Sequence, residues 1–208
     1  HPGSAGAGRG RGTRAPVSAR GAVVEGERVF LRRIRASDRD EFLARVHDSA
    51  ALHHPWSDPP RTLEEFDLLL RKSRRKSEER LVVCRTEDHA IVGVFGISQI
   101  FYGAFRNAYL GYYVFVPFSG EGYMREGLRL VLRHAFGPLE LHRLQANIQP
   151  ANATSIALVR RAGFKKEGLS RRYLMIDGEW RDHQQWVILA EDVAAATADG
   201  LGPRAGRR

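Results

Sequence analysis

A near-apolar run that ends at two closely spaced glycines is the feature that most constrains this chain. Residues 109–118 are almost entirely apolar or aromatic, and Gly120-Glu121-Gly122 follows shortly after. Aromatic and β-branched residues favour a strand over 108–116, and the glycines permit a tight turn before a helix expected over 123–136. Free amides at the start of a helix attract anions. The pattern therefore predicts a pyrophosphate cradle, with a plain strand-to-helix turn as the simpler alternative.

The same residues exclude two common nucleotide-binding loops. The dinucleotide fingerprint needs a third glycine and a downstream carboxylate for the ribose, and neither is in place. The Walker loop needs Gly-Lys followed by Ser or Thr, whereas this chain continues Gly-Tyr-Met. An anion at this turn would therefore be bound mainly by backbone amides in another kind of fold.

The positive charge of the chain is concentrated at its two ends. The formal net charge is +9 over 208 residues, and seven arginines lie in the terminal segments: Arg9, Arg11, Arg14, Arg20, Arg204, Arg207 and Arg208. A hydrophobic content of 43% and a charged content of 27% are ordinary for a folded domain. We expect one domain over 21–193 between flexible tails at 1–20 and 194–208. These basic tails are either solvated or in contact with RNA or the ribosome.

Several features predict a cytoplasmic protein without a disulfide, a membrane segment or a metal site. Cys84 is the single cysteine and lies in an apolar stretch, so we expect it in the core. Residues 1–20 lack the apolar region of a signal peptide. The ten residues of the 109–118 run are too few to span a bilayer as a helix. No histidine has the spacing of a zinc ligand.

Turn residues and apolar periodicity place the other elements. Thr62 and Glu65 form a capping box, Asn152 caps a helix that stops at Gly163, and Asp177-Gly178 suits a hairpin turn. Strands are expected at 28–35, 81–86, 90–100, 142–148, 171–176 and 180–189, and helices at 37–48 with Ser37 as cap, 62–80 and 152–163. This order predicts one α/β domain with a mixed sheet. The basic segment 71–80 is either a solvated helix end or a surface for an acidic partner.

Four short motifs occur in a fixed order after the predicted cradle. They are Gly-x-Gly-Tyr, Asn-x-x-Ser, Gly-Phe and Glu-Gly, formed by Gly120, Gly122, Tyr123, Asn152, Ser155, Gly163, Phe164, Glu167 and Gly168. With the closing stretch 173–183, this order resembles the GNAT acetyltransferase superfamily, in its RimJ/RimL-type protein N-terminal branch. The resemblance covers residues 27–193. It implies a GNAT fold with a centrally splayed sheet, acetyl-CoA as cofactor and a primary amine as acceptor, above all the N-terminal α-amine of a ribosomal protein.

The resemblance also implies where acetyl-CoA binds. The pantetheine arm would follow the end of the first splayed strand, the pyrophosphate would meet the glycine loop, and the thioester end would lie near the next helix. The cofactor-binding residues expected on this basis are Tyr113, Val114, Phe115, Val116, Gly120, Glu121, Gly122, Tyr123, Met124, Arg125, Asn152 and Ser155. Asn152 has a simpler alternative role as a helix cap alone.

The catalytic residues are less strongly implied. Many relatives use a tyrosine to protonate the leaving thiolate, but Val159 stands at that position, so Ser155 is the expected acid. Glu126 and Tyr173 are the candidate bases, since Gln145 stands where relatives often carry a glutamate. An α-amine with a pKa of about 8 is about a quarter neutral at pH 7.5, whereas a lysine amine is only about 0.1% neutral. A missing strong base therefore favours an α-amine acceptor.

The acceptor is expected opposite the cofactor. Trp56 in the proline-rich loop 53–60 would form one wall, and Tyr173, Asp182 and His183 the other. Trp56 could equally be packed in the core, and the two hairpin residues could serve as bases or simply stabilise the hairpin. Two other functions stay open at this point: acylation of a small amine or a lysine side chain, and a non-catalytic CoA- or RNA-binding module. The chain could be a monomer or a homodimer.

Overall fold

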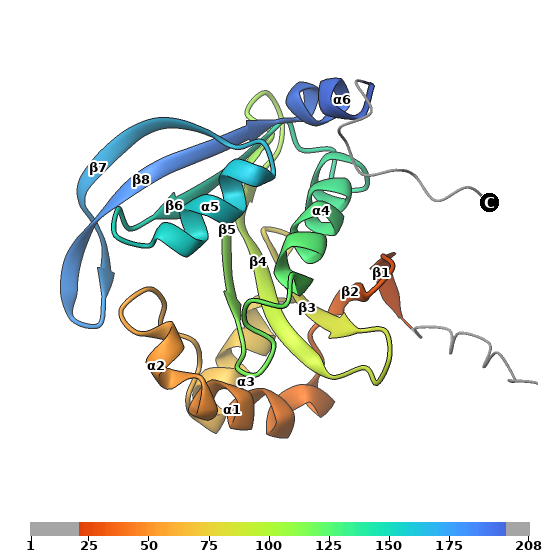
Figure 1. The fold of residues 1–208 in the computed structure, drawn as a ribbon, viewed down its shortest axis with the longest axis vertical. Coiled ribbons are helices and arrows are strands. Elements are labelled where there is room, and N and C mark those ends of the chain that lie inside the picture. Colours follow the sequence, from red (N-terminus) through yellow and green to blue (C-terminus); the bar gives the residue numbers. More distant parts are fainter. Residues whose placement is uncertain (1–20, 199–208) are drawn as a thin grey trace, which may run out of the picture.

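An eight-stranded mixed sheet organises the computed structural model, which describes residues 21–198 (Figure 1). Its order is β1-β2-β3-β4-β5-β6-β8-β7. The strands are β1 (Ala22–Glu25), β2 (Val29–Arg33), β3 (Glu78–Arg85), β4 (Ile91–Phe101), β5 (Asn107–Val114), β6 (Arg143–Ile148), β7 (Lys165–Ile176) and β8 (Glu179–Leu189). The helices are η1 (Ala36–Asp38), α1 (Arg39–Asp48), α2 (Ala50–His53), α3 (Leu63–Lys72), α4 (Tyr123–Phe136), α5 (Ala153–Arg161) and α6 (Ala190–Ala198). The predicted mixed α/β domain is confirmed.

The sheet opens in its middle, between β5 and β6. These two strands are parallel and pair from Asn107–Arg143 to Leu110–Ala146, whereas every other neighbouring pair in the described sheet is antiparallel. Beyond Leu110, β5 continues to Val114 without a register partner on β6 in the described chain. The predicted splayed sheet is therefore present, with the gap at the carboxyl ends of both strands.

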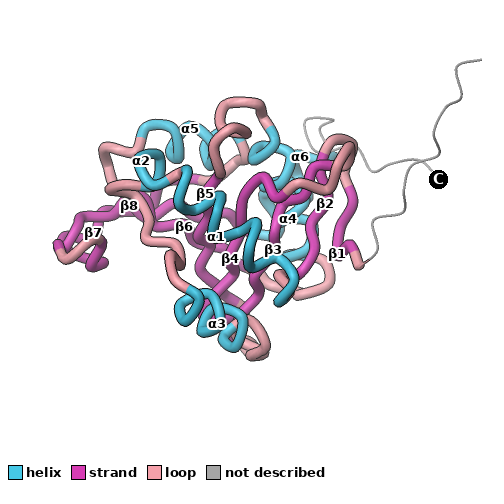
Figure 2. Tube along the Cα trace, turned by 90° about the horizontal axis from the view of Figure 1, so that it is seen from below, coloured by secondary structure: helices cyan, strands magenta, loops and turns pink. Residues whose placement is uncertain are grey.

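The two faces of the sheet carry different helices. Figure 2 shows α5 and α3 on opposite sides of the strands. Successive side chains of β5 point to opposite faces. Tyr112 accordingly contacts Ser155 of α5, and Tyr113 packs edge-on against Phe42 of α1. The core includes Cys84, which is fully buried as expected, and burial raises the pKa of its thiol to about 11.

Helix α4 matches its expected range from Tyr123 to Phe136. It begins after Gly122, which has a φ of +83° that only glycine adopts without strain. Leu128, Val131 and Ala135 are buried on one face and hold the helix on the sheet. The helix ends where Gly137-Pro138 removes both helix propensity and a backbone donor.

The structure corrects several element boundaries. Helix α3 ends at Lys72 rather than near Arg80, because its apolar positions end at Leu70, and β3 begins at Glu78. The capping box of Thr62 and Glu65 at its start is confirmed. Ser37 is not the cap of α1: it lies within η1, and Asp38 holds the N-cap position of α1 while its carboxylate accepts the Arg35 amide at the start of η1.

Three elements were not expected, namely β1, α2 and α6, and β7 begins six residues earlier than predicted, at Lys165. Helix α6 ends at Ala198, so it includes the first residues of the expected tail from 194. The tail at 1–20 and the remainder of the second tail, 199–208, lie outside the described residues. Within residues 21–198 no helix is long and apolar enough to cross a membrane.

Candidate active site

A pair of hydroxyl groups lies where β5 and β6 separate. Tyr112 lies two positions after Leu110, the last residue of β5 that pairs with β6, and its side chain reaches α5. Ser155 Oγ donates a hydrogen bond to Tyr112 Oη at 2.8 Å, and Tyr112 Oη donates to the Ser155 carbonyl at 3.3 Å. The pair therefore joins the two sides of the gap.

The position of Ser155 is fixed by the helix cap. Asn152 Oδ1 accepts the Ser155 amide at 3.0 Å, as expected for an N-cap. Burial raises the pKa of Tyr112 to about 12, although its hydrogen bond with Ser155 opposes the shift. Tyr112 is therefore a neutral proton donor throughout the physiological range. The two hydroxyls can donate or relay a proton, and neither is ionised in the resting site.

Two polar side chains bind the end of β5 from the opposite face. Ser49 Oγ accepts the Val116 amide at 3.0 Å, and His53 Nε2 lies 2.9 Å from the Val114 carbonyl. Both Ser49 and His53 are buried, and the ring of His53 packs against Tyr113 and Phe115. The junction of α1 and α2 thus holds the strand end in place.

These bonds determine which backbone groups of β5 face the gap. The Phe115 amide donates to the carbonyl of Val92 in β4, so Tyr113 and Phe115 direct their main-chain groups toward β4. By alternation, Tyr112 and Val114 direct theirs toward the gap. The Val114 carbonyl and the Val116 amide are already engaged by His53 and Ser49. The Val114 amide and both main-chain groups of Tyr112 are left facing the gap.

The glycine loop lies at the same end of the sheet. Gly120 and Gly122 have φ values of +84° and +83°, so both positions require glycine. Arg28 holds the loop through its guanidinium, which donates to the Glu121 carbonyl at 3.1 Å and lies 4.3 Å from the Tyr123 ring centroid. Met124 and Arg125 follow in the first turn of α4, where main-chain amides lack intrahelical partners. The loop can therefore hold an anion.

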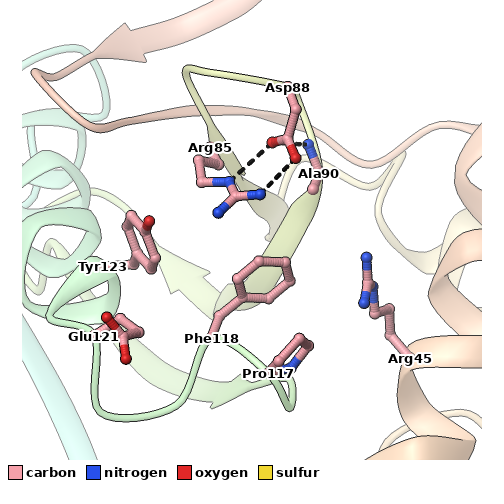
Figure 3. A pocket seen from close by; sticks show the side chains of 8 residues that line it. All are labelled: Arg45, Arg85, Asp88, Ala90, Pro117, Phe118, Glu121 and Tyr123. Atoms are coloured by element: carbon pink, nitrogen blue, oxygen red, sulfur yellow. Dashed lines mark hydrogen bonds and ion pairs between the residues drawn. The ribbon is translucent and has the colours of Figure 1, made fainter.

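A cavity of about 340 Å³ adjoins this loop (Figure 3). Arg45 and Arg85 lie over the Phe118 ring, with guanidinium carbons 5.0 and 5.3 Å from its centroid. Asp88 binds Arg85 through two hydrogen bonds of 2.9 and 2.5 Å. Arg85 and Arg28 both lower the pKa of the Tyr123 hydroxyl. The lining carries two arginines and two carboxylates, Asp88 and Glu121, so an anion at this loop would depend mainly on main-chain amides.

The acceptor side is bounded by the loop after α2 and by the β7–β8 hairpin. Gln149 Nε2 donates to the Pro55 carbonyl at 2.7 Å, which ties the loop to the end of β6. His54 Nδ1 lies 3.1 Å from Asp177 Oδ2 in the hairpin turn. Trp56 directly follows these two attached residues in the sequence and is partly buried. The loop and the hairpin turn therefore meet through His54 and Asp177.

Glu126 lies elsewhere. Its Oε1 accepts the amides of Arg28 at 2.8 Å and Val29 at 3.3 Å, so it joins α4 to β2. Because β2 and β5 are separated by three strand spacings, this carboxylate is about 14 Å from the gap. The geometry gives Glu126 a structural contact and does not bring it to Ser155.

The three residues expected to act from the β7–β8 hairpin, Tyr173, Asp182 and His183, differ in their contacts and burial. Asp182 Oδ1 accepts the Arg172 amide at 2.7 Å, where β7 is irregular and Arg172 has a φ of +47°, so Asp182 stabilises the hairpin. His183 is buried, and its ring lies 6.1 Å from that of Tyr173. Burial raises the pKa of Tyr173, and burial lowers the pKa of His183. Both shifts keep these side chains neutral near pH 7.

The remaining polar side chain near the gap is an amide. Among residues 21–198, no group of three or more His, Cys, Asp or Glu side chains is arranged to hold a metal ion. Gln145 is buried on β6, and its amide donates to Asn147 Oδ1 at 2.8 Å. An amide at this position binds its neighbours and does not act as a base at neutral pH.

Sequence reasoning missed Tyr112, Ser49 and His53. The signal for Tyr112 was its alternation with Tyr113, since one of two adjacent tyrosines in a strand must face α5. Nothing local marked Ser49 or His53, because each contacts β5 more than sixty positions further along the chain.

We expect His53 to make the fold sensitive to acid. Burial lowers the pKa of His53, so the folded state keeps it neutral while the unfolded chain takes up a proton below about pH 6.5. The contribution of neutral His53 to the free energy of unfolding is thus complete above about pH 6.5 and decreases as the pH falls below it. His53→Gln, which can still donate to Val114, should lose less Tm than the parent between about pH 7 and about pH 5. Equal losses in thermal melts would contradict this role, and His183 contributes equally to both proteins.

Known proteins match this architecture. The family model described as Acetyltransferase (GNAT) domain matches residues 28–165. The probable N-acetyltransferase YjcK of Bacillus subtilis is 31% identical over 181 residues, covering 82% of this chain and 98% of that protein. The ribosomal protein uS5-alanine N-acetyltransferase of Escherichia coli is 40% identical over 106 residues, which are 51% of this chain and 55% of that protein.

A solved structure agrees with these matches. Mycobacterium smegmatis RimJ in complex with CoA-disulfide superposes with a TM-score of 0.72 at 31% identity, covering 83% of this chain and 89% of that one. GNAT enzymes transfer an acetyl group from acetyl-CoA, which answers the alternative of a non-catalytic module. The chain therefore belongs to the GNAT family of acetyl-CoA-dependent N-acetyltransferases.

Proposed function

We propose that this enzyme acetylates the N-terminal α-amine of a protein, of the ribosomal-protein class. The observation that carries the proposal is the neutral Ser155–Tyr112 pair at the β5–β6 gap, in a site whose candidate carboxylates bind elsewhere. Such a site suits an amine that is already partly neutral at physiological pH. The relative from Escherichia coli, named for an alanine of protein uS5, supports the same acceptor class.

The residues present fit acetyl-CoA. The Val114 amide and the main chain of Tyr112 would hold the pantetheine arm in the gap, in preference to the Val116 amide, which Ser49 occupies. The amides after Gly120 and Gly122 would hold the pyrophosphate, with Arg28 fixing the loop. Tyr113 and Phe115 contribute their backbone to β4, and their side chains shape the wall near His53.

Acetyl-CoA, when bound, supplies an acetyl group activated as a thioester. The acceptor nitrogen forms the new amide bond while the carbon–sulfur bond breaks, and the sulfur leaves with the electron pair. Ser155 Oγ would give its proton to that sulfur, and its hydrogen bond to Tyr112 Oη, 2.8 Å long, holds the hydroxyl in place. The proton lost by the amine would return to Ser155 through water, so no strong base is required.

The acceptor preference follows from acid–base chemistry. An α-amine with a pKa of about 8 is about a quarter neutral at pH 7.5, compared with about 0.1% for a lysine amine. Without a nearby carboxylate base, this difference of over a hundredfold is expressed directly in the rate. Peptide α-amines should therefore exceed lysine and polyamine acceptors.

We expect acetyl-CoA and a panel of acceptors to show this preference by intact-mass spectrometry. Peptides that begin with Ala or Ser should gain one acetyl group, whereas the same peptides with a blocked N-terminus and one internal lysine should be acetylated about 100-fold more slowly. Spermidine serves as the small-amine arm of the panel.

Faster acetylation of the blocked lysine peptide or of spermidine would overturn the proposed acceptor class. A control with Glu126→Gln tests the site assignment in the same assay. It should retain the acceptor order, since Glu126 binds β2 and not the gap.

A further inference from the structure

A second concave surface lies at the end of the sheet opposite the glycine loop. It is a groove of about 610 Å³ between the turn that follows α3, the beginning of β3 and the end of β4. Six of its lining residues are cationic, namely Arg33, Arg35, Arg74, Arg75, Lys76 and Arg80. We call this surface the basic groove. The proposed acetyl-transfer site uses none of these residues.

The acidic residues of the basic groove do not cancel its charge. Glu79 is bound by Arg33, whose guanidinium approaches to 2.5 and 3.2 Å, and Glu78 pairs with Arg80 at 3.2 Å. Arg74, Arg75 and Lys76 are exposed and form no ion pair with any residue of 21–198. Arg74, Arg75 and Lys76 therefore give the groove a positive charge that its two carboxylates do not neutralise. The groove therefore fits a ligand with several negative charges.

An exposed aromatic ring lines the groove, and two more lie close to it in the sequence. Tyr102 lines the groove and is 52% exposed, and Phe101 and Phe105 in the same turn are 50% and 58% exposed. The rings of Phe101 and Phe105 lie 6.1 Å apart and pack against each other in solvent. The carboxylate side chains of an acidic peptide do not stack on such rings, whereas unpaired bases do. Cations for phosphates beside rings for bases are the combination that binds single strands.

We propose that the basic groove binds single-stranded RNA, with phosphates on the 74–76 turn and bases on Tyr102 and Phe105. The choice of RNA over DNA rests on the proposed function, because acceptors of the ribosomal class are bound to RNA. Bound RNA would hold the enzyme near a ribonucleoprotein acceptor while leaving the gap at the other end of the sheet open.

Fluorescence anisotropy with a labelled oligouridine of about 12 nucleotides tests the proposal on the full chain. The triple variant Arg74→Gln, Arg75→Gln, Lys76→Gln should weaken binding about tenfold and reduce the slope of log affinity against log salt by about 2. Tyr102→Ala with Phe105→Ala should weaken single-strand binding about tenfold and leave binding to duplex RNA almost unchanged.

A matched control removes the same charge elsewhere. Arg160→Gln, Arg161→Gln, Lys166→Gln changes exposed residues of α5 and β7 and should leave affinity within about twofold. Oligouridine binding that survives the groove variants would overturn the proposal, and so would equal affinity for a poly-glutamate peptide or for oligodeoxythymidine. Peptide acetylation by the groove variants is measured in parallel and should be unchanged. RNA binding without acetylation would refute the proposed function alone, and acetylation without RNA binding would refute this inference alone.

Discussion

Replacing Ser155 with alanine is expected to lower kcat for acetyl transfer by about 100-fold, with little change in the KM for acetyl-CoA. The hydroxyl of Ser155 lies at the separation of β5 and β6, where Asn152 fixes its helix and Tyr112 fixes its rotamer. A group that protonates the departing sulfur acts only in the transition state, so its loss appears in kcat. Thiol release under steady-state conditions measures both constants.

The controls for this change lie in the same helix. Thr154→Ala removes an exposed hydroxyl one position earlier and should have no effect on kcat. Ser155→Thr retains a hydroxyl and should recover most of the rate. If Ser155→Ala turned over as fast as the parent enzyme, water or another group would have to protonate the sulfur, and the assignment of the acid would be wrong.

Tyr112→Phe separates the two members of the pair. The ring keeps its packing against Phe95, 5.6 Å between centroids, and only the hydroxyl is lost. The variant loses the bond from Ser155 Oγ and the longer bond to the Ser155 carbonyl, and at about 1 kcal/mol for a neutral hydrogen bond the rate should fall at least about fivefold. If Tyr112 acts through Ser155, adding Tyr112→Phe to Ser155→Ala should produce no further decrease. Independent decreases in the double variant would indicate two separate roles.

The glycine loop and its helix could be predicted closely because their signals are local. A glycine that needs a positive φ, a buried apolar face and a Gly-Pro stop all lie within the element itself, and α4 matches its expected limits. Asn152 was predictable for the same reason, since an N-cap binds an amide three positions away. The glycine loop was therefore predictable without tertiary information.

The contacts that complete the site could not be read in this way. Ser155 meets Tyr112 across 43 positions, and His53 meets Val114 across 61. Such pairs depend on how the sheet brings α5 and α2 to the two faces of one strand. The same limit explains Glu126. Its position after the glycine motif made it a candidate base, but its carboxylate accepts the Arg28 amide just before β2.

The basic segment 71–80 shows a different failure. Its charges were expected on a helix, either as a solvated end or as a surface for an acidic partner, but the helix stops at Lys72. The residues that bear them form a turn and the beginning of β3, and only this arrangement sets Arg74 and Lys76 beside Tyr102. The composition of the segment predicted its charge. Its conformation depended on where the apolar positions of α3 end, and this could not be read from the charges.

Phe42→Ala is expected to destabilise the enzyme by about 3–5 kcal/mol, a large share of the stability of a typical domain. Phe42 is fully buried, and its ring makes edge contacts with Phe66 at 5.1 Å, Phe115 at 5.8 Å and Tyr113 at 6.5 Å between centroids. It therefore joins α1, α3 and β5 in one cluster. Urea denaturation should show a lower midpoint with the same m value.

The cluster also predicts a selective loss of function. The α1–α2 junction carries Ser49 and His53, which hold the end of β5, so a cavity at Phe42 loosens the strand that faces the gap. Phe42→Leu refills much of that cavity and should recover both stability and kcat, whereas Leu63→Ala, at a residue that is 53% exposed on α3, should change neither by more than about 0.5 kcal/mol. A Phe42→Ala enzyme that is less stable but fully active well below its Tm would show that the order of β5 does not depend on this packing. Recovery of both properties in Phe42→Leu would instead tie acetyl transfer to the helices on the far face of the sheet.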